Sequence, residues 1–244
     1  MVDLAPHVRA VLAGKEPARD LSGELTDLTT AYDLADKTFE AVSPTCGWKI
    51  AANAPDQRAN PDLGAPIFAR IAGGAPVPTG SVLKLSDFTD FALEPEFAAV
   101  LGAPVSQPLD APGAREKIAA IHVAFELLDR RGLGPVFHLP TFVALNVFNA
   151  GVVMGQEVPK AALADYSARF SMAAETQLSG RNTAPQDPFE AVADTLNHAT
   201  SRGFSVPAGA VILCGTHHPP VSISAPTAVE FEVSGRVVSL SISD

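Results

Sequence analysis

The 244-residue chain has only two cysteines, Cys46 and Cys214, and a single tryptophan. The two cysteines lie far apart in the sequence and match no spacing of metal-binding thiolates, which argues against a disulfide framework and a thiolate metal site. Free cysteines are usually small buried hydrophobic groups, and we expect the same of these two. The sequence predicts no thiol chemistry.

Basic residues are also scarce: 17 Lys and Arg face 27 Asp and Glu, for a formal net charge of -10. Without a basic cluster, the chain is a poor match for nucleic acid or for an anionic membrane surface. No stretch reaches the roughly 18 apolar residues of a membrane helix, and the first residues lack a signal-peptide pattern. We therefore expect a cytoplasmic protein with neither nucleic acid nor membrane as a partner.

Apolar residues, in contrast, are plentiful. Hydrophobic residues make up 47% of the chain and charged residues 18%, so a large core can form. We find no internal repeat, low-complexity tract or interdomain linker. The simplest organisation is a single domain, with a helical N-terminal segment over residues 1–45 and the main body over residues 46–244.

Helical periodicity is confined to a few windows. Residues 25–42 carry Leu25, Leu28, Tyr32, Ala35 and Phe39 at spacings of three and four, with Thr26 or Asp27 as a cap. A shorter amphipathic run precedes them at 6–15. Two later windows, 113–131 and 187–203, also read as helices; the second has a cap at Asp187, a proline in its first turn and a glycine at its end.

From residue 46 onward the chain is rich in proline and glycine, and its apolar runs are short. Alternating or β-branched runs bounded by turn residues are typical of strands. Such runs are "CGWKIAAN", "GSVLKLSDF", "FALEPEFAAVLG", "PTFVALNVFNAGVVMG", "AGAVILCGTHH", "TAVEFEVSG" and "RVVSLSIS". The "SGR" at 234–236 predicts a hairpin turn. The pattern indicates a β-rich α+β protein built on a sandwich or barrel-like sheet.

Two acids interrupt the apolar run at 91–101. In a strand, residues two apart share a face, so Glu94 and Glu96 would present their carboxylates side by side. Partly desolvated anions this close take up a proton unless a cation lies between them. Hard oxygen ligands suit Mg²⁺, Mn²⁺ or Ca²⁺. The alternative is an edge strand with both acids in solvent, which Pro95 would favour.

Two more charged residues lie within apolar segments. Glu126 falls in "IAAIHVAFELLD" and would need a partner if buried, either a metal site or Arg130 four residues on along a helix. Lys49 follows Trp48. Its ammonium could have a lowered pKa and transfer protons, or its stem could pack while the charged end reaches water.

The order of the segments carries more information than any one of them. "CGWKIAAN", "LGAPIFARI", "LEPEFAAVLG", "AFELLDRR", "GVVMG", "PFEAVADTLNH" and "AGAVILCGT" occur in this sequence. Together they resemble the fumarylacetoacetate hydrolase superfamily, and within it the branch of 2-oxopent-4-enoate hydratases and 4-oxalocrotonate decarboxylases. The resemblance covers about residues 31–240. Its most specific parts are the G-x-K-I segment, the E-x-E strand and the A-x-E-x-x-x-x-R segment.

The resemblance implies a fold, a cofactor and a reaction. It implies a mixed β-sandwich or roll with peripheral helices, a homo-oligomer, and Mg²⁺ or Mn²⁺ held by Glu94, Glu96 and Glu126. Lys49 matches the active-site lysine, and the substrate would be a small 2-oxo acid. The expected activity is hydration of a 2-hydroxypenta-2,4-dienoate-like acid by a metal-dependent lyase. Alternatives are a 4-oxalocrotonate-type decarboxylase, an acylpyruvate C–C hydrolase, or a non-catalytic member that binds ligand or an active homologue.

Four further residues are candidates for substrate binding by position in the resemblance: Thr216, His217, Asn146 and Arg130. His217 or the adjacent His218 could contact substrate or act as a base near neutral pH, whereas His122 and His138 match no motif and are expected to be structural.

Three positions depart from the hydratase pattern. Ile67 and Leu145 stand where hydratases have acids, and Ala210 replaces another. The expected pocket is therefore more apolar.

Overall fold

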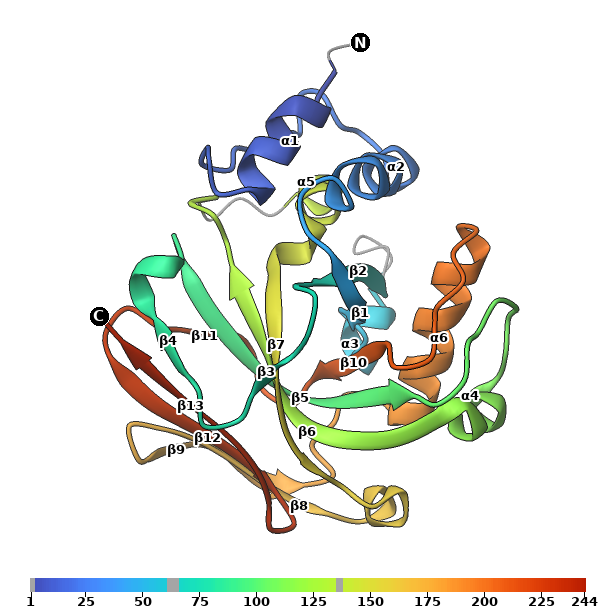
Figure 1. Ribbon diagram of the computed structural model, residues 1–244, viewed down its shortest axis with the longest axis vertical. Coiled ribbons are helices and arrows are strands. Elements are labelled where there is room, and N and C mark those ends of the chain that lie inside the picture. Colours follow the sequence, from blue (N-terminus) through green and yellow to red (C-terminus); the bar gives the residue numbers. More distant parts are fainter. Residues whose placement is uncertain (1–2, 61–65, 135–137) are drawn as a thin grey trace.

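The computed structural model describes residues 3–60, 66–134 and 138–244. It is built on two β-sheets, with helices packed at the top and at the right of the view in Figure 1. The α-helices are α1 (Ala5–Leu12), α2 (Leu28–Phe39), α3 (Pro55–Arg58), α4 (Ala111–Lys117), α5 (Leu139–Ala144) and α6 (Pro188–Ser201). Short 3-10 helices in the described ranges are η2 (Leu85–Asp87), η3 (Asn146–Phe148) and η4 (Lys160–Ala164). This β-rich α+β architecture confirms the predicted fold class.

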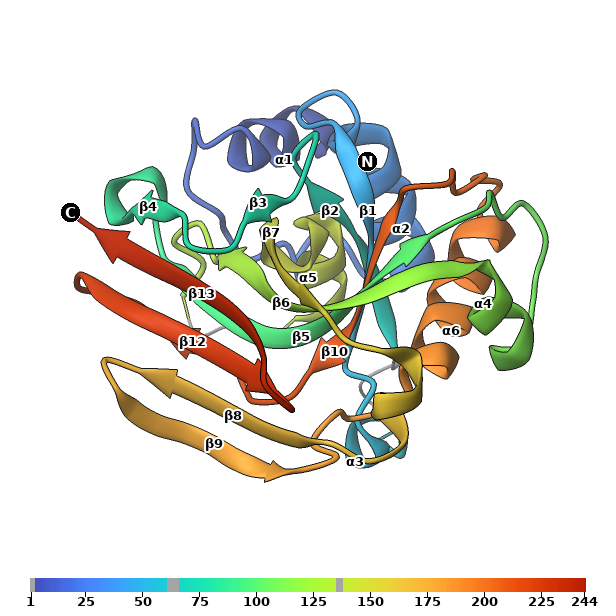
Figure 2. The same cartoon turned by 60° about the horizontal axis from the view of Figure 1, so that its bottom comes forward.

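The larger sheet has eight strands in the order β2-β1-β10-β5-β6-β7-β3, with β11 paired to β5. Its strands are β1 (Thr45–Ala51), β2 (Ile67–Ala72), β3 (Val77–Pro78), β5 (Phe91–Leu101), β6 (Ile118–Asp129), β7 (Asn149–Glu157), β10 (Val211–Thr216) and β11 (Val221–Ser222). The sheet is strongly curled (Figures 1 and 2). Its concave side encloses a small apolar cluster that includes Ala98, Ala124 and Leu213.

The smaller sheet has five strands in the order β4-β13-β12-β8-β9 and packs beside β6 and β7 (Figure 2). Its strands are β4 (Val82–Lys84), β8 (Ser167–Met172), β9 (Glu175–Arg181), β12 (Thr227–Val233) and β13 (Arg236–Ser243). Phe125 of β6 meets Phe170 of β8 edge to face, with ring centroids 5.9 Å apart. The predicted turn at 234–236 joins β12 to β13, with positive φ at Ser234 and Gly235.

The predicted helices α1, α2 and α6 are all present. Asp27 caps α2, because its carboxylate accepts a hydrogen bond from the Thr30 amide at 2.8 Å. Asp187 caps α6 in the same way. The N-terminal helices pack on the sheet in one apolar cluster that joins Val8 and Ala31 to Ile67 and Leu128.

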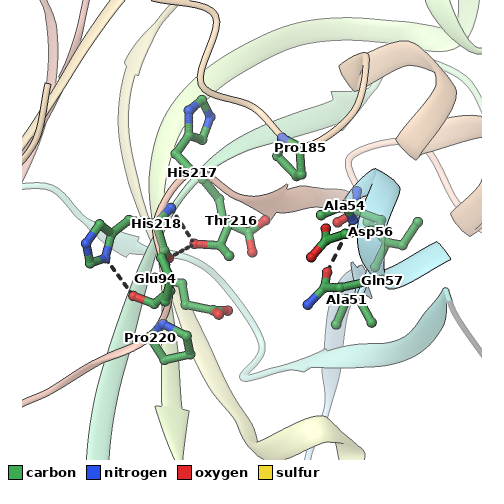
Figure 3. A pocket seen from close by; sticks show the side chains of 15 residues that line it. Ala51, Ala54, Asp56, Gln57, Glu94, Pro185, Thr216, His217, His218 and Pro220 are labelled. Carbon is green, nitrogen blue, oxygen red and sulfur yellow. Dashed lines mark hydrogen bonds between the residues drawn. The ribbon is translucent and has the colours of Figure 1, made fainter. Parts of the chain in front are cut away.

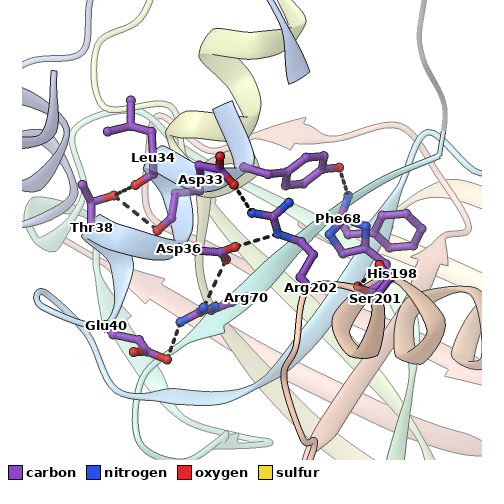
Figure 4. Close-up of polar contacts among 12 residues, drawn as sticks. Asp33, Leu34, Asp36, Thr38, Glu40, Phe68, Arg70, His198, Ser201 and Arg202 are labelled. Atoms are coloured by element: carbon purple, nitrogen blue, oxygen red, sulfur yellow. Dashed lines mark hydrogen bonds and ion pairs between the residues drawn. The ribbon is translucent and has the colours of Figure 1, made fainter. Parts of the chain in front are cut away.

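An ion-pair network fastens α2 and α6 to the sheet (Figure 4). The buried Arg70 on β2 pairs with Asp36 at 3.1 Å, and Arg202 pairs with the other oxygen of Asp36 at 2.6 Å. The Arg70 guanidinium also lies over the rings of Trp48 and Phe204. Cation–π contacts and shared acids keep this buried cation neutralised.

The structure corrects one predicted helix. Within 113–131 the helix α4 ends at Lys117, and residues Ile118–Asp129 form β6 between β5 and β7. A strand buried on both faces is apolar throughout, so its sequence lacks the alternation that separates strand from helix. Arg130 therefore cannot pair with Glu126 along a helix; it lies near Asp90 and donates to Ser222 instead.

A predicted strand is also wrong in part. Within 140–155 the chain first forms α5, then a left-handed turn, and only from Asn149 the strand β7. Asn146, Val147 and Phe148 all have positive φ, between 46° and 60°. Such backbone is unfavourable for residues with a Cβ, above all for the β-branched valine, and is found where surrounding packing imposes it.

Two asparagine side chains, one from η3 and one from β7, bond the edge strand β2 of the curled sheet. The amide of Asn146 bonds both backbone groups of Arg70 on β2, at 3.0 and 2.9 Å. The Asn149 side chain accepts from the Ala72 amide at 2.8 Å. Side chains here take the place of a strand-to-strand ladder, and they hold β7 close to β2.

Gly47 allows the closest approach between β1 and β10. A Cβ at this position would lie 1.8 Å from the Val211 carbonyl oxygen, whereas a Cβ at Gly23 would meet nothing within 4 Å. We predict that Gly47→Ala lowers the free energy of unfolding by about 3 kcal/mol or more, because the backbone itself must shift. Gly23→Ala is the matched control and should leave chemical denaturation unchanged. Equal midpoints for the two variants would contradict this account of the strand contact.

Candidate metal centre

The curled sheet brings four charged side chains from three strands to one place. Lys49 comes from β1, Glu94 and Glu96 from β5, and Glu126 from β6. One carboxylate oxygen of each glutamate lies within 4.8 Å of the others. The three predicted acids therefore lie close together in the structure. Both acids of the E-x-E pair point toward Glu126 rather than to solvent.

The strand register forces two of these acids to face each other. Glu94 on β5 is directly opposite Glu126 on β6 in the antiparallel ladder. Like charges directly opposite one another on neighbouring strands destabilise a sheet. Glu126 and Glu96 are almost fully buried, at 0% and 1% exposure, so water does not reduce the repulsion. This arrangement calls for positive charge nearby.

Part of that charge comes from Lys49, which is 1% exposed. Its ammonium lies 2.6 Å from Oε1 of Glu126 and donates to the Val147 carbonyl at 3.4 Å. Burial alone would lower the pKa of Lys49, but the charges of Glu126 and Glu94 outweigh it and the pKa is raised. The prediction of a lowered lysine pKa is thus wrong, and so is the alternative of a charged end in water.

Neutral donors fix the acids as well. The Asn149 amide donates to Glu126 Oε1 at 2.8 Å, and the backbone amide of Gly215 donates to Glu96 Oε2 at 2.8 Å. Gly215 has a φ of +99°, and its missing Cβ leaves space for the Asn53 side chain. Asn53 in turn donates to the Cys214 carbonyl. These contacts aim both carboxylates into the interior of the curled sheet.

One carboxylate oxygen of the cluster has no such donor. Oε2 of Glu126 is buried without a hydrogen-bond partner in the described part of the chain. Burial, followed by the charge of Glu126, raises the pKa of Glu94 to about 8. The same two causes raise the pKa of Glu96 well above its ordinary value. One ammonium does not neutralise three carboxylates.

The arrangement fits a divalent cation. Three carboxylates from a rigid sheet supply hard oxygen ligands, and a buried oxygen without a donor is a free ligand position. Such donors suit Mg²⁺, Mn²⁺ or Ca²⁺, whereas zinc and copper prefer nitrogen or sulfur. Glu94, Glu96 and Glu126 would hold the ion, and Lys49 would lie beside it as a second positive charge.

A cavity of about 330 Å³ opens next to the acids. Glu94 and Glu96 line this cavity, and Figure 3 shows Thr216 and His218 beside Glu94, with Asp56 and Gln57 of α3 facing them. Alanine and proline side chains make up much of the remaining wall. The cavity is large enough for a small organic acid beside a metal ion.

The four predicted substrate-binding residues have different surroundings. Thr216 lines the cavity, and its hydroxyl donates to the His218 carbonyl. His217 also borders it, but its ring packs against Phe97 and Phe231, and burial lowers its pKa to about 3. The prediction that His217 acts as a base near neutral pH is therefore wrong, whereas the same role for His218 stays a prediction.

The other two candidates lie away from the cavity. Asn146 is buried, and both ends of its amide are used by the backbone of Arg70. Arg130 does not border the cavity and contacts Ser222. Of the histidines expected to be structural, His122 bonds the Gly155 carbonyl and His138 the Thr141 hydroxyl.

The three departures from the hydratase pattern are all buried. Ile67 and Leu145 lie in the apolar cluster beneath the N-terminal helices, and Ala210 lies at another groove. None of them borders the cavity itself. Residues 63–65 of the "LGAPIFARI" segment lie outside the described residues. Cys214 is buried, as predicted, whereas Cys46 is half-buried.

Sequence reasoning missed Asn149, Asn53 and Asp56. Asn149 contacts Glu126, Asn53 supports the strand that bonds Glu96, and Asp56 borders the cavity. The two asparagines stand in apolar surroundings where a buried amide is unusual. That was the available signal, but it does not say which backbone the amide meets.

A family model describing the C-terminal domain of fumarylacetoacetate hydrolase matches residues 36–240. The chain belongs to the fumarylacetoacetate hydrolase family. Comparison with curated proteins by sequence gives no match. The matched residues include Lys49 and all three clustered glutamates.

Solved structures of the family share the fold. 4-oxalocrotonate decarboxylase from Pseudomonas putida G7, complexed with magnesium and adipate, has a TM-score of 0.86 at 21% identity, covering 98% of this chain and 95% of its own. Fumarylpyruvate hydrolase from Pseudomonas aeruginosa, in complex with Mn²⁺ and pyruvate, has a TM-score of 0.61 at 16% identity, covering 82% and 91%. No helix in the described ranges is long and apolar enough to cross a membrane.

The raised pKa of Glu94 predicts how stability depends on pH when metal is removed. Between its ordinary value of 4.5 and about 8, folded Glu94 holds a proton that the unfolded chain lacks. The metal-free protein should therefore lose stability as pH rises through this window. We expect its melting temperature in EDTA to fall by about 5 °C or more from pH 5.5 to 8.5.

Added Mg²⁺ or Mn²⁺ should reverse this loss, with the larger effect at the higher pH, because the ion then displaces fewer protons. Glu230→Gln on the exposed face of β12 is the control, whereas Glu94→Gln should flatten the pH dependence. A metal-free protein whose melting temperature is constant over this range would contradict the assignment.

Proposed function

We propose that this protein is a divalent-metal-dependent lyase that hydrates 2-hydroxypenta-2,4-dienoate-like 2-oxo acids. The observation that carries the proposal is the free buried oxygen of Glu126, which faces two further glutamates beside the cavity. The bound metals of two family structures, magnesium and manganese, support the same cofactor here. Glu94, Glu96 and Glu126 are proposed as its ligands.

The chain's own residues suit chemistry through an enolate. When bound, a divalent ion would draw electron density from the substrate's 2-oxygen and carboxylate. Lys49 keeps its positive charge through Glu126, so it would donate a hydrogen bond to the same oxygen as negative charge develops there. The Asn149 amide keeps Glu126 in place during this change.

The cavity shape suits the rest of the substrate. Its walls of alanine and proline would exclude water from the carbons near the 2-oxygen, and its open side admits the water that adds to the distal double bond. Thr216, half-buried beside Glu94, is the nearest neutral hydroxyl on the wall. We propose it as a substrate contact.

Decarboxylation is the second candidate. The 4-oxalocrotonate decarboxylase structure covers nearly the whole of both chains, whereas fumarylpyruvate hydrolase covers less and has a lower TM-score. The same electron withdrawal at the 2-oxygen would assist loss of carbon dioxide from a substrate with a second carboxylate. A C–C hydrolase of acylpyruvates is less favoured by this comparison. A homo-oligomer is also proposed, by analogy with the family, and light scattering would test it.

The reaction can be identified by supplying 2-hydroxydienoates, 4-oxalocrotonate and acylpyruvates to the full chain with Mg²⁺ or Mn²⁺. Hydration removes the conjugated absorbance without releasing carbon dioxide. Decarboxylation releases carbon dioxide, and C–C hydrolysis of an acylpyruvate produces pyruvate. We expect the first outcome. Stoichiometric metal binding without turnover of any of these acids would contradict the enzyme assignment and favour a ligand-binding member of the family.

Lys49→Met should separate catalysis from metal loading. We expect kcat to fall by about 10³-fold, because the donor at the developing oxyanion is lost. Metal affinity should be kept or increased, since a positive neighbour has been removed. Titration calorimetry with Mn²⁺ measures the second effect.

The comparison variant is Glu96→Gln, which should weaken Mn²⁺ binding by about a hundredfold or more through loss of a charged ligand. Circular dichroism checks that both variants fold. Unchanged turnover in Lys49→Met would remove this residue from the mechanism.

A further inference from the structure

The cavity beside the three glutamates contains no free cation. No lysine or arginine borders it among the described residues, and the ammonium of Lys49 is already paired with Glu126. The His217 ring is buried and neutral, with a pKa of about 3. His218 uses its Nδ1 to donate to the Pro219 carbonyl.

The guanidinium on α3 is also engaged by other residues. Arg58 of α3 donates to the Asn53 carbonyl at 3.1 Å and to Gln186 at 2.9 Å, and it is paired with Asp194. The residues outside the described ranges, 1–2, 61–65 and 135–137, contain no lysine, arginine or histidine. Apart from the His218 imidazole, the described residues therefore offer no second positive group to a substrate held at the glutamates.

The wall facing Glu94 carries negative charge rather than positive charge. Asp56 lies on α3, borders the cavity and is exposed, and Figure 3 shows it across the cavity from Glu94. Among the described residues no hydrogen bond or ion pair joins its carboxylate to a partner. A substrate whose first carboxylate is bound beside Lys49 would direct its tail toward this acid.

We propose that Asp56 is a specificity-determining residue that excludes a second carboxylate, so that the site takes 2-oxo acids with one carboxylate and an uncharged tail. The inference rests on the proposed function, because it needs the 2-oxo acid end bound at the glutamates. Repulsion between two carboxylates that share a cavity disfavours the dicarboxylate, and no cation offsets it. The structure thereby favours hydration over decarboxylation of a dicarboxylate.

A matched pair of ligands tests the proposal. Binding of 2-oxohexanoate and 2-oxohexanedioate, each of six carbons, is measured by calorimetry with the Mn²⁺-loaded full chain at pH 8, above the ordinary pKa of histidine. We expect the monocarboxylate to bind about tenfold more tightly. Added salt should reduce the difference in affinity between the two ligands, because Asp56 is exposed and salt screens its repulsion of the second carboxylate.

Variants then assign the effect to one side chain. Asp56→Asn should improve binding of the dicarboxylate about threefold, and Asp56→Lys about tenfold or more, with little change for the monocarboxylate. Glu116→Lys, on α4 and away from the cavity, is the control for the same change in net charge. The salt effect on the wild-type chain provides a second readout that needs no variant.

The outcomes distinguish this inference from the proposed function. Equal or tighter binding of the dicarboxylate by the wild-type chain would overturn the inference and leave the metal-dependent reaction standing. So would an equal response of the two ligands to Asp56→Lys. Failure of both acids to bind the Mn²⁺-loaded chain would overturn the proposed function itself.

Discussion

The burial of three carboxylates around one ammonium is the constraint on which the site depends. Glu94 and Glu126 are opposed by strand register, and Glu96 joins them from the same face of β5. Lys49 compensates one of the charges, and raised pKa values at Glu94 and Glu96 express the deficit that remains. Removing these charges from water costs free energy. A divalent cation bound by the three carboxylates would offset that cost.

The rest of the fold serves to hold these groups at their positions. Gly47 lets β1 approach β10, which places Lys49 near β6 despite the two strands between them. The left-handed turn at Asn146–Phe148 presents the Val147 carbonyl to the same ammonium. Strained backbone beside a buried charged cluster is typical of functional sites, where packing enforces a conformation that the residues disfavour.

Much of this could be predicted from local patterns. The E-x-E strand, the capped helix at 28–39 and the hairpin at 234–236 follow from periodicity and turn chemistry. The strand 118–129 could not, since a run buried on both faces has no alternation. The contacts of Asn149 and the location of Arg130 depend on long-range closure of the sheet, which no short window contains. The charged residues of the site could be predicted from the sequence, whereas the neutral groups that orient them could not.

The closure between β2 and β7 relies on the amides of two asparagines rather than on a continuous ladder. Such a seam lacks the continuous, cooperative hydrogen bonds of the long strand pairs beside it, such as β5–β6, so we expect it to open earlier than they do and to show faster amide exchange. Asn149 bonds β2 and also donates to Glu126, so each opening of the seam would also weaken the hydrogen bond that holds this carboxylate in place. The position of Glu126 in the site therefore depends on β2 and β7 staying joined.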